Sequence, residues 1–146
     1  MIVERSCKKV GSTKGQSIVE SSPLLKCRLR GINKKILEIK EALKFQDFTK
    51  FGTIVEAEAI NMHAIMMTSN PPLFYWSPET FKLMLAVSEW RDNGLECYFT
   101  IDAGPNVHVL CKGKDEKKVL GSLNRLDYIL NVIVNKPSKG AELIFD

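Results

Sequence analysis

The run CYFTIDAGPNVHVLC at residues 97–111 contains one carboxylate, Asp102, inside an otherwise apolar stretch. The preceding residues alternate as in a half-buried strand, which places Asp102 on the more polar face, at the carboxyl end where α/β architectures often bind ligands. Gly104 can take a positive φ and lets another group approach the backbone, and Pro105 stiffens the turn. Taken alone, these residues favour an aspartate that caps a hairpin turn, and a ligand-binding carboxylate is the alternative.

A second polar stretch, GSTKGQ at residues 11–16, precedes a helical pattern. Thr13 and Gln16 have the spacing of a capping box, which predicts a helix that starts near Thr13. A hydroxyl group and free backbone amides at a helix N-terminus also form an anion site. Ser12 and Thr13 therefore fit either a plain helix cap or a contact to phosphate.

The other residues of reactive types form no recognisable constellation. The four cysteines contain no CxxC pair and the two histidines lie far from a matching ligand pattern, so no metal site is expected. His63, between Met62 and Ala64 in a predicted helix, is more typical of a packed core histidine than of a catalytic one.

Helix signals divide the first two thirds of the chain. Apolar residues recur at helical spacing from Leu29 to Leu43, after Pro23, which can open that helix. Asp47 is the predicted N-cap of the next helix, which Asn70-Pro71-Pro72 ends. Ser77-Pro78-Glu79 predicts a further helix that ends near residues 93–94.

Strand signals dominate the remainder. Strands are predicted at 96–102 and 106–112, a helix over about 114–127, and short strands at 130–134 and 141–145; residues 1–6 fit an edge strand. With no internal repeat and no long linker, the pattern predicts one domain. We expect the α+β class, an antiparallel sheet covered by helices.

Composition excludes several classes of function. The net charge of +4 is mild and the lysines are spread along the chain, so nucleic acid is not an expected partner. No apolar run is long enough to span a bilayer and no signal peptide is visible, so no membrane association is expected. We expect a cytoplasmic protein with reduced thiols.

Several stretches together resemble one enzyme family. FTIDAGPNVHVL resembles the signature near the C-terminal end of the diphosphomevalonate decarboxylases, members of the galactokinase, homoserine kinase and mevalonate kinase superfamily. KKVGSTKGQSIVESS resembles the family's Ser-Ser-x-x-Gly-Met segment and its Val-Glu-Thr-Ser. EAEAINMHAIMMTSNPPLFYW resembles its long helix and Pro-Pro-aromatic loop. The order is the same and nearly the whole chain is covered, so we expect the C-terminal domain type of this superfamily.

The resemblance implies a reaction, a carboxy-lyase activity that uses ATP and Mg²⁺. The family phosphorylates the tertiary hydroxyl of mevalonate 5-diphosphate, then releases phosphate and carbon dioxide to give isopentenyl diphosphate. Asp102 would act as the base or orient that hydroxyl, and Ala103 would add a backbone contact. Ser12, Thr13 and Gln16 would contact the substrate phosphates. Gly11 and Gln16 depart from the family's serine and methionine, which leaves a monophosphate substrate open.

The phosphate loop that binds ATP in this superfamily, Pro-x-x-x-Gly-Leu-x-Ser-Ser, does not occur in the sequence. We therefore expect residues 1–146 to be a single C-terminal, substrate-side domain. The N-terminal ATP-binding domain would be absent from this chain, and the fragment alone inactive. A stand-alone ligand-binding module, a phosphomevalonate decarboxylase and a mevalonate kinase are the alternatives. The sequence also allows a homodimer.

Overall fold

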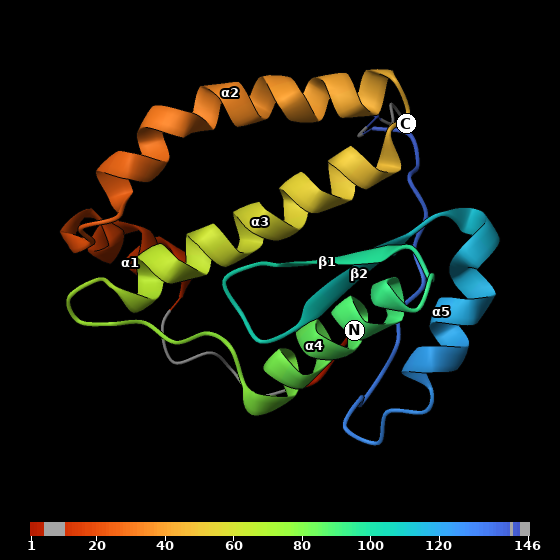
Figure 1. Cartoon of the computed structure of the whole chain (residues 1–146). Helices are drawn as coiled ribbons and strands as arrows, with labels where there is room; N and C mark the ends of the chain where they lie inside the picture. The colour runs from red at the N-terminus through yellow and green to blue at the C-terminus, as the bar shows by residue number, and fades with distance from the viewer. Residues whose placement is uncertain (5–10, 141, 144–146) are drawn as a thin grey trace.

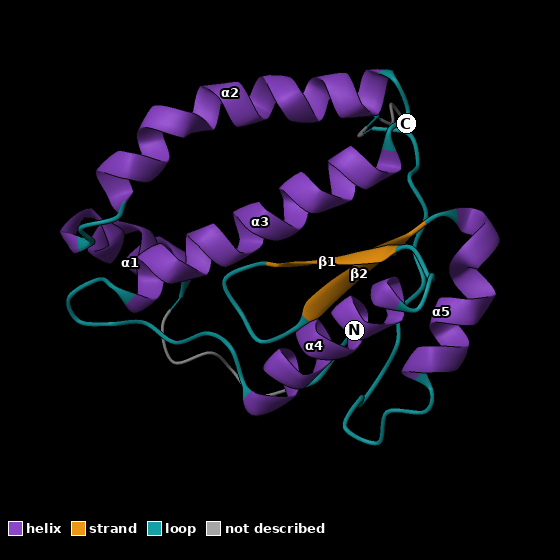
Figure 2. Cartoon of the chain, viewed as in Figure 1, coloured by secondary structure: helices purple, strands orange, loops and turns teal. Residues whose placement is uncertain are grey.

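A computed structural model of the chain describes residues 1–4, 11–140 and 142–143. The elements run in this order: α1 (Ser12–Ile18), η1 (Val19–Ser21), α2 (Leu25–Lys44), α3 (Phe48–Met67), α4 (Pro78–Asp92), β1 (Cys97–Ile101), β2 (Val107–Cys111), η2 (Gly113–Asp115) and α5 (Glu116–Leu123). Figures 1 and 2 show helices packed around one antiparallel pair of strands. The α+β class expected from the sequence is confirmed.

Helices cover the sheet, with α3 and α4 packed against β1 and α2 lying outside α3 (Figure 1). The inward residues of β1, Cys97, Phe99 and Ile101, form the main hydrophobic core with Leu83 and Val87 of α4. All five side chains are buried, as the alternation along the strand predicts. This core fixes β1, and therefore the point where the chain turns at residue 102.

On the other side of β1, Thr100 is half-buried, but Tyr98 is buried, which the alternation did not predict. Tyr98 is only 3% exposed. Gly52 of α3 makes this possible, because a Cβ at that position would overlap the Tyr98 ring. The close approach of α3 to β1 therefore depends on the absence of a side chain at residue 52.

Capping residues set the helix ends largely where the sequence predicts. The Asp47 side chain accepts a hydrogen bond from the Lys50 backbone N–H at 2.9 Å and so caps α3. Ser77 and Thr80 form a complete capping box at the start of α4. Gly94, with φ of +87°, follows the end of α4.

The structure corrects the strands predicted outside the hairpin. Residues 130–134 do not form a strand; Asn131 makes only an isolated bridge with Ile2. The start of the chain contacts both segments. Ile2 forms the bridge with Asn131, and the Met1 carbonyl accepts a hydrogen bond from the Val107 N–H of β2 at 3.1 Å. The helix predicted over 114–127 is shorter, and residues 5–6 and most of 141–145 lie outside the described residues.

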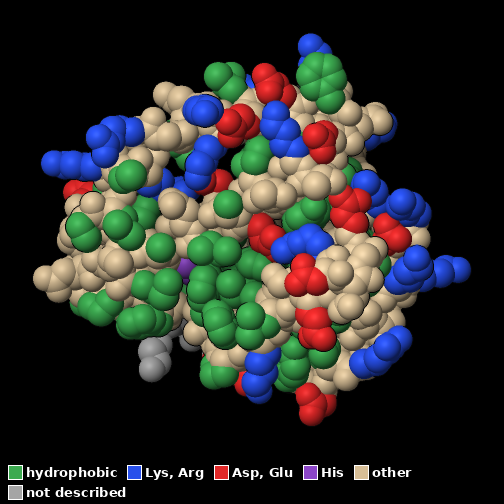
Figure 3. All heavy atoms as spheres, viewed as in Figure 1, with side chains coloured by type: hydrophobic (Ala, Val, Ile, Leu, Met, Phe, Trp, Pro, Cys, Tyr) green, Lys and Arg blue, Asp and Glu red, His purple; other side chains and the backbone are tan. Residues whose placement is uncertain are grey.

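The helix α2 is held to α3 on one side only. Glu58 of α3 forms ion pairs with Arg28, at 2.6 Å, and with Lys35. Leu29, Ile36 and Leu43 share the predicted periodicity but are exposed, because α3 covers only part of the apolar face of α2. On the face that Figure 3 shows, the largest group of hydrophobic side chains lies below α3, near the hairpin and α4. None of the helices described is long and apolar enough to cross a membrane.

Candidate functional site

The turn at residues 102–106 is held in place by side chains from distant segments. Thr80, fully buried at the start of α4, donates a hydrogen bond from Oγ1 to the Pro105 carbonyl at 2.6 Å. The Asn106 side-chain oxygen accepts hydrogen bonds from the backbone N–H groups of Val3, at 2.9 Å, and Glu4, at 3.3 Å. The turn is therefore positioned by long-range contacts as well as by its own sequence.

Gly104 meets one of the two expectations for it, access to the backbone, but not the positive φ. It is not among the glycines with positive φ. A Cβ at residue 104 would meet no atom within 4 Å. The glycine therefore leaves open space beside the turn, which another molecule could occupy.

The Asp102 carboxylate projects into solvent from this turn. Its side chain is 92% exposed, and its Oδ2 lies 3.6 Å from Nε2 of the exposed His108 on β2. The Gly104 N–H bonds instead to the Asp102 backbone carbonyl, at 2.7 Å. The turn is thus closed by the main chain of Asp102, and the carboxylate is accessible to a ligand.

His63 of α3 lies directly behind Asp102. Its side chain is 1% exposed, and Nε2 is 3.1 Å from the Asp102 carbonyl oxygen. Burial lowers the pKa of His63, although hydrogen bonds to the carbonyls of Ile101 and Asp102 and the Asp102 charge act in the opposite direction. The neutral ring therefore donates its Nε2–H to this carbonyl. His63 is buried, as expected, but its link to residue 102, 39 positions away, carries no sequence signal.

The polar stretch at residues 11–16 packs onto the same region. Met66, Leu73 and Tyr75 form a small hydrophobic cluster, and Ala103 of the turn packs against it together with Ile18 and Val19. Gly15 lies against Tyr75 so closely that a Cβ there would be 2.5 Å from the Tyr75 hydroxyl oxygen. The structure therefore brings α1 and the Asp102 turn to one cluster, as a shared site requires.

The start of α1 differs from the predicted capping box. The helix begins at Ser12 with Gly11 as its N-cap, so Thr13 is inside the helix and no side chain of the N-cap residue can cap it. Thr13 and Gln16 are exposed, and the side chain of Ser12 lies outside the described part of the chain. The prediction that Thr13 caps this helix is therefore wrong.

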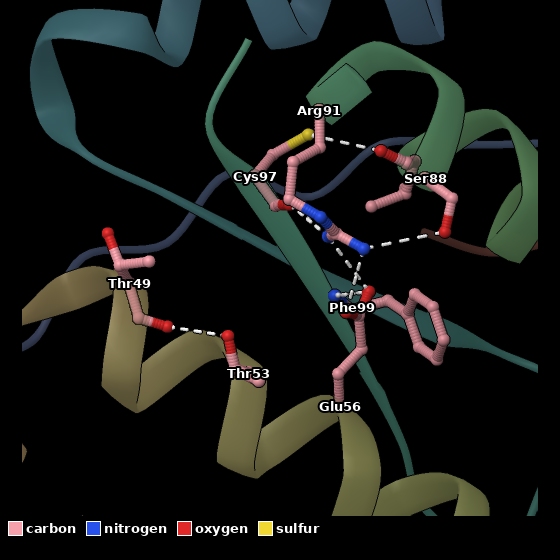
Figure 4. A network of polar contacts seen from close by, with 8 residues as sticks. Thr49, Thr53, Glu56, Ser88, Arg91, Cys97 and Phe99 are labelled. Carbon is pink, nitrogen blue, oxygen red and sulfur yellow. Dashed lines mark hydrogen bonds and ion pairs between the residues drawn. The ribbon is translucent and has the colours of Figure 1, made fainter. Parts of the chain in front are cut away.

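β1, which leads directly into Asp102, is also anchored along the edge that faces away from β2. Glu56 of α3 and Arg91 of α4 form an ion pair with an N–O distance of 3.0 Å (Figure 4). The Glu56 carboxylate accepts from the Phe99 N–H at 3.3 Å, and Arg91 donates to the Cys97 carbonyl at 2.7 Å. These two side chains satisfy backbone groups that a neighbouring strand would otherwise bind.

The described residues contain no group of three or more His, Cys, Asp or Glu side chains that could hold a metal ion. Burial raises the pKa of the Cys97 thiol to about 11, so this thiol is protonated at neutral pH. Beside this turn, Asp102 and His108 both present titratable side chains to solvent.

Fold and site together define an α+β domain that presents an exposed aspartate on a turn held by contacts to α3 and α4. Residues 1–139 match the mevalonate 5-diphosphate decarboxylase C-terminal domain. The chain belongs to this family, which confirms the resemblance noted in the sequence.

Individual relatives agree with this assignment. The diphosphomevalonate decarboxylase of Debaryomyces hansenii is 30% identical over 125 residues, which cover 83% of this chain and 32% of the relative. The mevalonate diphosphate decarboxylase of Staphylococcus aureus has a similar structure, with a TM-score of 0.79 and 34% identity over 84% of this chain and 37% of that one. The structure of MDDEF in complex with MVAPP, AMPPCP and magnesium gives a TM-score of 0.78 and 36% identity, over 81% and 36%. The chain thus spans about a third of the length of its relatives.

Proposed function

We propose that this chain is the C-terminal, substrate-side part of an ATP-dependent decarboxylase. The reaction converts mevalonate 5-diphosphate to isopentenyl diphosphate, phosphate and carbon dioxide. The observation that carries the proposal is the exposed Asp102 carboxylate on a turn that is fixed from three sides, in a chain of this family. The MVAPP and AMPPCP bound in the related structure support a phosphorylated mevalonate and ATP as the substrates.

Asp102 would act on the tertiary hydroxyl of the substrate. A carboxylate beside an alcohol can accept its proton as the oxygen attacks the γ-phosphate, and can hold that oxygen in line. Phosphate and carbon dioxide then leave together, and a carbon–carbon double bond remains. The exposure of Asp102 and the open space at Gly104 support this role, because the substrate must reach the carboxylate.

The substrate phosphates would lie at the start of α1. Ser12, Thr13 and Gln16 supply polar side chains there, and Ala103 supplies a backbone contact from the turn. The packing of α1 and of Ala103 on the cluster around Tyr75 supports a single site that spans both segments. Mg²⁺ would neutralise phosphate charge, but the described residues hold no suitable cluster, so we assign it to no residue of this chain.

The parts of the enzyme that bind ATP would lie in a domain outside residues 1–146. We propose an N-terminal ATP-binding domain as the partner of residues 1–146 and membership of the galactokinase, homoserine kinase and mevalonate kinase superfamily. We also propose a cytoplasmic location, where ATP and phosphorylated intermediates are available.

Product analysis on the complete protein tests the proposal. The protein would be incubated with ATP, Mg²⁺ and either mevalonate 5-diphosphate or mevalonate 5-phosphate, and carbon dioxide and ADP would be measured. We expect equal amounts of both products with the diphosphate. Carbon dioxide from the monophosphate alone would indicate a phosphomevalonate decarboxylase. ADP without carbon dioxide would indicate a kinase, and substrate binding with neither product a ligand-binding module.

A further inference from the structure

The Asp102 carboxylate is exposed, but its backbone is held by a buried polar side chain. His63 Nε2 lies 3.1 Å from the Asp102 carbonyl oxygen, and the His63 side chain is almost fully buried. Loss of this acceptor would leave the buried imidazole with the Ile101 carbonyl as its remaining backbone partner, and would cost hydrogen-bond energy. The carbonyl of Asp102 is therefore tied to α3.

Aromatic rings fix the orientation of His63. The Trp76 ring centroid lies 4.7 Å from that of His63, and the Tyr75 ring lies 6.1 Å away in an edge-on arrangement. Among the described residues, Tyr75 OH and Trp76 Nε1 are buried without a hydrogen-bond partner, whereas His63 hydrogen-bonds to the Asp102 carbonyl. The rings hold the imidazole so that its donor points at residue 102.

The two ends of the turn are therefore fixed by different helices. His63 of α3 holds the carbonyl at the first residue, and Thr80 of α4 holds the carbonyl of Pro105. Because the side chain of Asp102 is 92% exposed and short, the position of its backbone decides where the carboxylate can reach. A displacement of about 1 Å at a reacting group can cost roughly 10²-fold in rate.

We infer that His63 is a positioning residue, which places the Asp102 carboxylate for the reaction through a hydrogen bond to the Asp102 carbonyl. The expected effect of His63 on kcat rests on the proposed function. The contact itself does not depend on it.

The experiment compares three variants in the complete protein. His63→Leu keeps an apolar side chain but removes the donor, and His63→Gln keeps an N–H donor. Ile65→Ala, at a buried position of the same helix, controls for general destabilisation. We expect kcat to fall about 10-fold or more in His63→Leu with a smaller change in KM. His63→Gln should recover most of kcat, and Ile65→Ala should lower the melting temperature without lowering kcat.

A double substitution separates positioning from a structural role. In an Asp102→Asn background, His63→Leu should cause little further loss of kcat, because the two residues act as a unit. Additive losses, or a His63→Leu enzyme with normal kcat, would overturn the inference.

A second readout does not require activity. In residues 1–146, the NMR amide signals of Asp102, Ala103 and Gly104 should shift in His63→Leu and return toward wild type in His63→Gln. If the wild-type enzyme produces no carbon dioxide, the proposed function fails, and this readout still decides whether His63 positions the turn. Equal shifts in both variants would contradict the inference.

Discussion

At the scale of single residues, Asp102 differs from the residues that surround it. Thr80, Asn106 and His63 all use polar atoms to hold the turn. Among the described residues, the Asp102 carboxylate has one polar contact, with the exposed His108 at 3.6 Å. An ion pair this exposed contributes about 0–1 kcal/mol. The turn is therefore stable without the carboxylate, which leaves the charge available for chemistry.

Asp102→Asn should consequently leave stability almost unchanged. We expect the unfolding free energy of residues 1–146 to change by less than about 0.5 kcal/mol, as for other exposed substitutions. Thr80→Val is the matched control, because it removes the buried donor to the Pro105 carbonyl and should cost about 1–3 kcal/mol. Urea unfolding measures both. A large loss in Asp102→Asn would instead indicate that the aspartate caps the turn.

His63 should make stability depend on pH. Its pKa in the folded chain lies below the ordinary value of 6.5, so the unfolded chain binds more protons as the pH falls below that value. Folded wild-type protein should therefore lose stability between about pH 7 and pH 5 more steeply than His63→Gln. Urea unfolding at several pH values tests this, because the two proteins differ only at residue 63. Parallel curves for the two proteins would show that burial does not oppose protonation of His63.

At the scale of elements, β1 is fixed on both faces and at its edge. The Glu56–Arg91 pair joins α3, α4 and the backbone of β1, and the guanidinium carbon of Arg91 lies 4.7 Å from the centroid of the Tyr98 ring. Both charged side chains are mostly buried. Removal of one of them leaves the other charge without compensation in a poorly solvated position.

Glu56→Ala should destabilise the chain strongly, by about 3–5 kcal/mol, because Arg91 and the Phe99 N–H both lose a partner. Glu41→Ala is the control, since Glu41 forms an exposed ion pair with Lys50 at 3.3 Å and should cost about 0–1 kcal/mol. Chemical unfolding of residues 1–146 gives both values. Similar small losses in the two variants would mean that the Glu56 network does not anchor β1.

The packing of α1 can be tested through Gly15. Gly15→Ala places a Cβ against the buried Tyr75 hydroxyl and should cost about 1–3 kcal/mol. In a Tyr75→Phe background the nearest remaining contacts are 3.6 Å and longer, so the same change should be neutral or stabilise α1 by about 0.5–1 kcal/mol. A double-mutant cycle followed by urea unfolding measures the difference. The same cost in both backgrounds would contradict the contact between α1 and Tyr75.

The sequence predicted most helices and strands, because capping residues and turn residues next to them determine where they begin and end. Asp47 and Ser77 cap helices where the sequence places them, and the hairpin strands are correct to within one residue. The sequence did not predict the bridge between Ile2 and Asn131 or the burial of Tyr98 against α3. Both depend on contacts between distant segments. In the site, resemblance to a family motif drew attention to Asp102, and its role stays a prediction. The contact between His63 and the Asp102 carbonyl has no sequence signal, because it depends on tertiary packing.

At the scale of the whole molecule, the proposed function makes this chain one part of a two-part catalyst. Positioning and charge stabilisation provide most of the catalysis in phosphoryl transfer, so the nucleotide and the alcohol must be held together. The chain spans about a third of its relatives' length and lacks the phosphate loop of the superfamily. Its contribution would be the substrate phosphates at α1 and the carboxylate at Asp102.

The most direct test of this account is kcat for carbon dioxide release from mevalonate 5-diphosphate by the complete protein, in wild type and in Asp102→Asn. Asparagine keeps the shape of the side chain but removes its charge and basicity. We expect kcat to fall about 10²-fold or more, with a much smaller change in KM. An Asp102→Asn enzyme that releases carbon dioxide at a near-normal kcat would contradict the central claim.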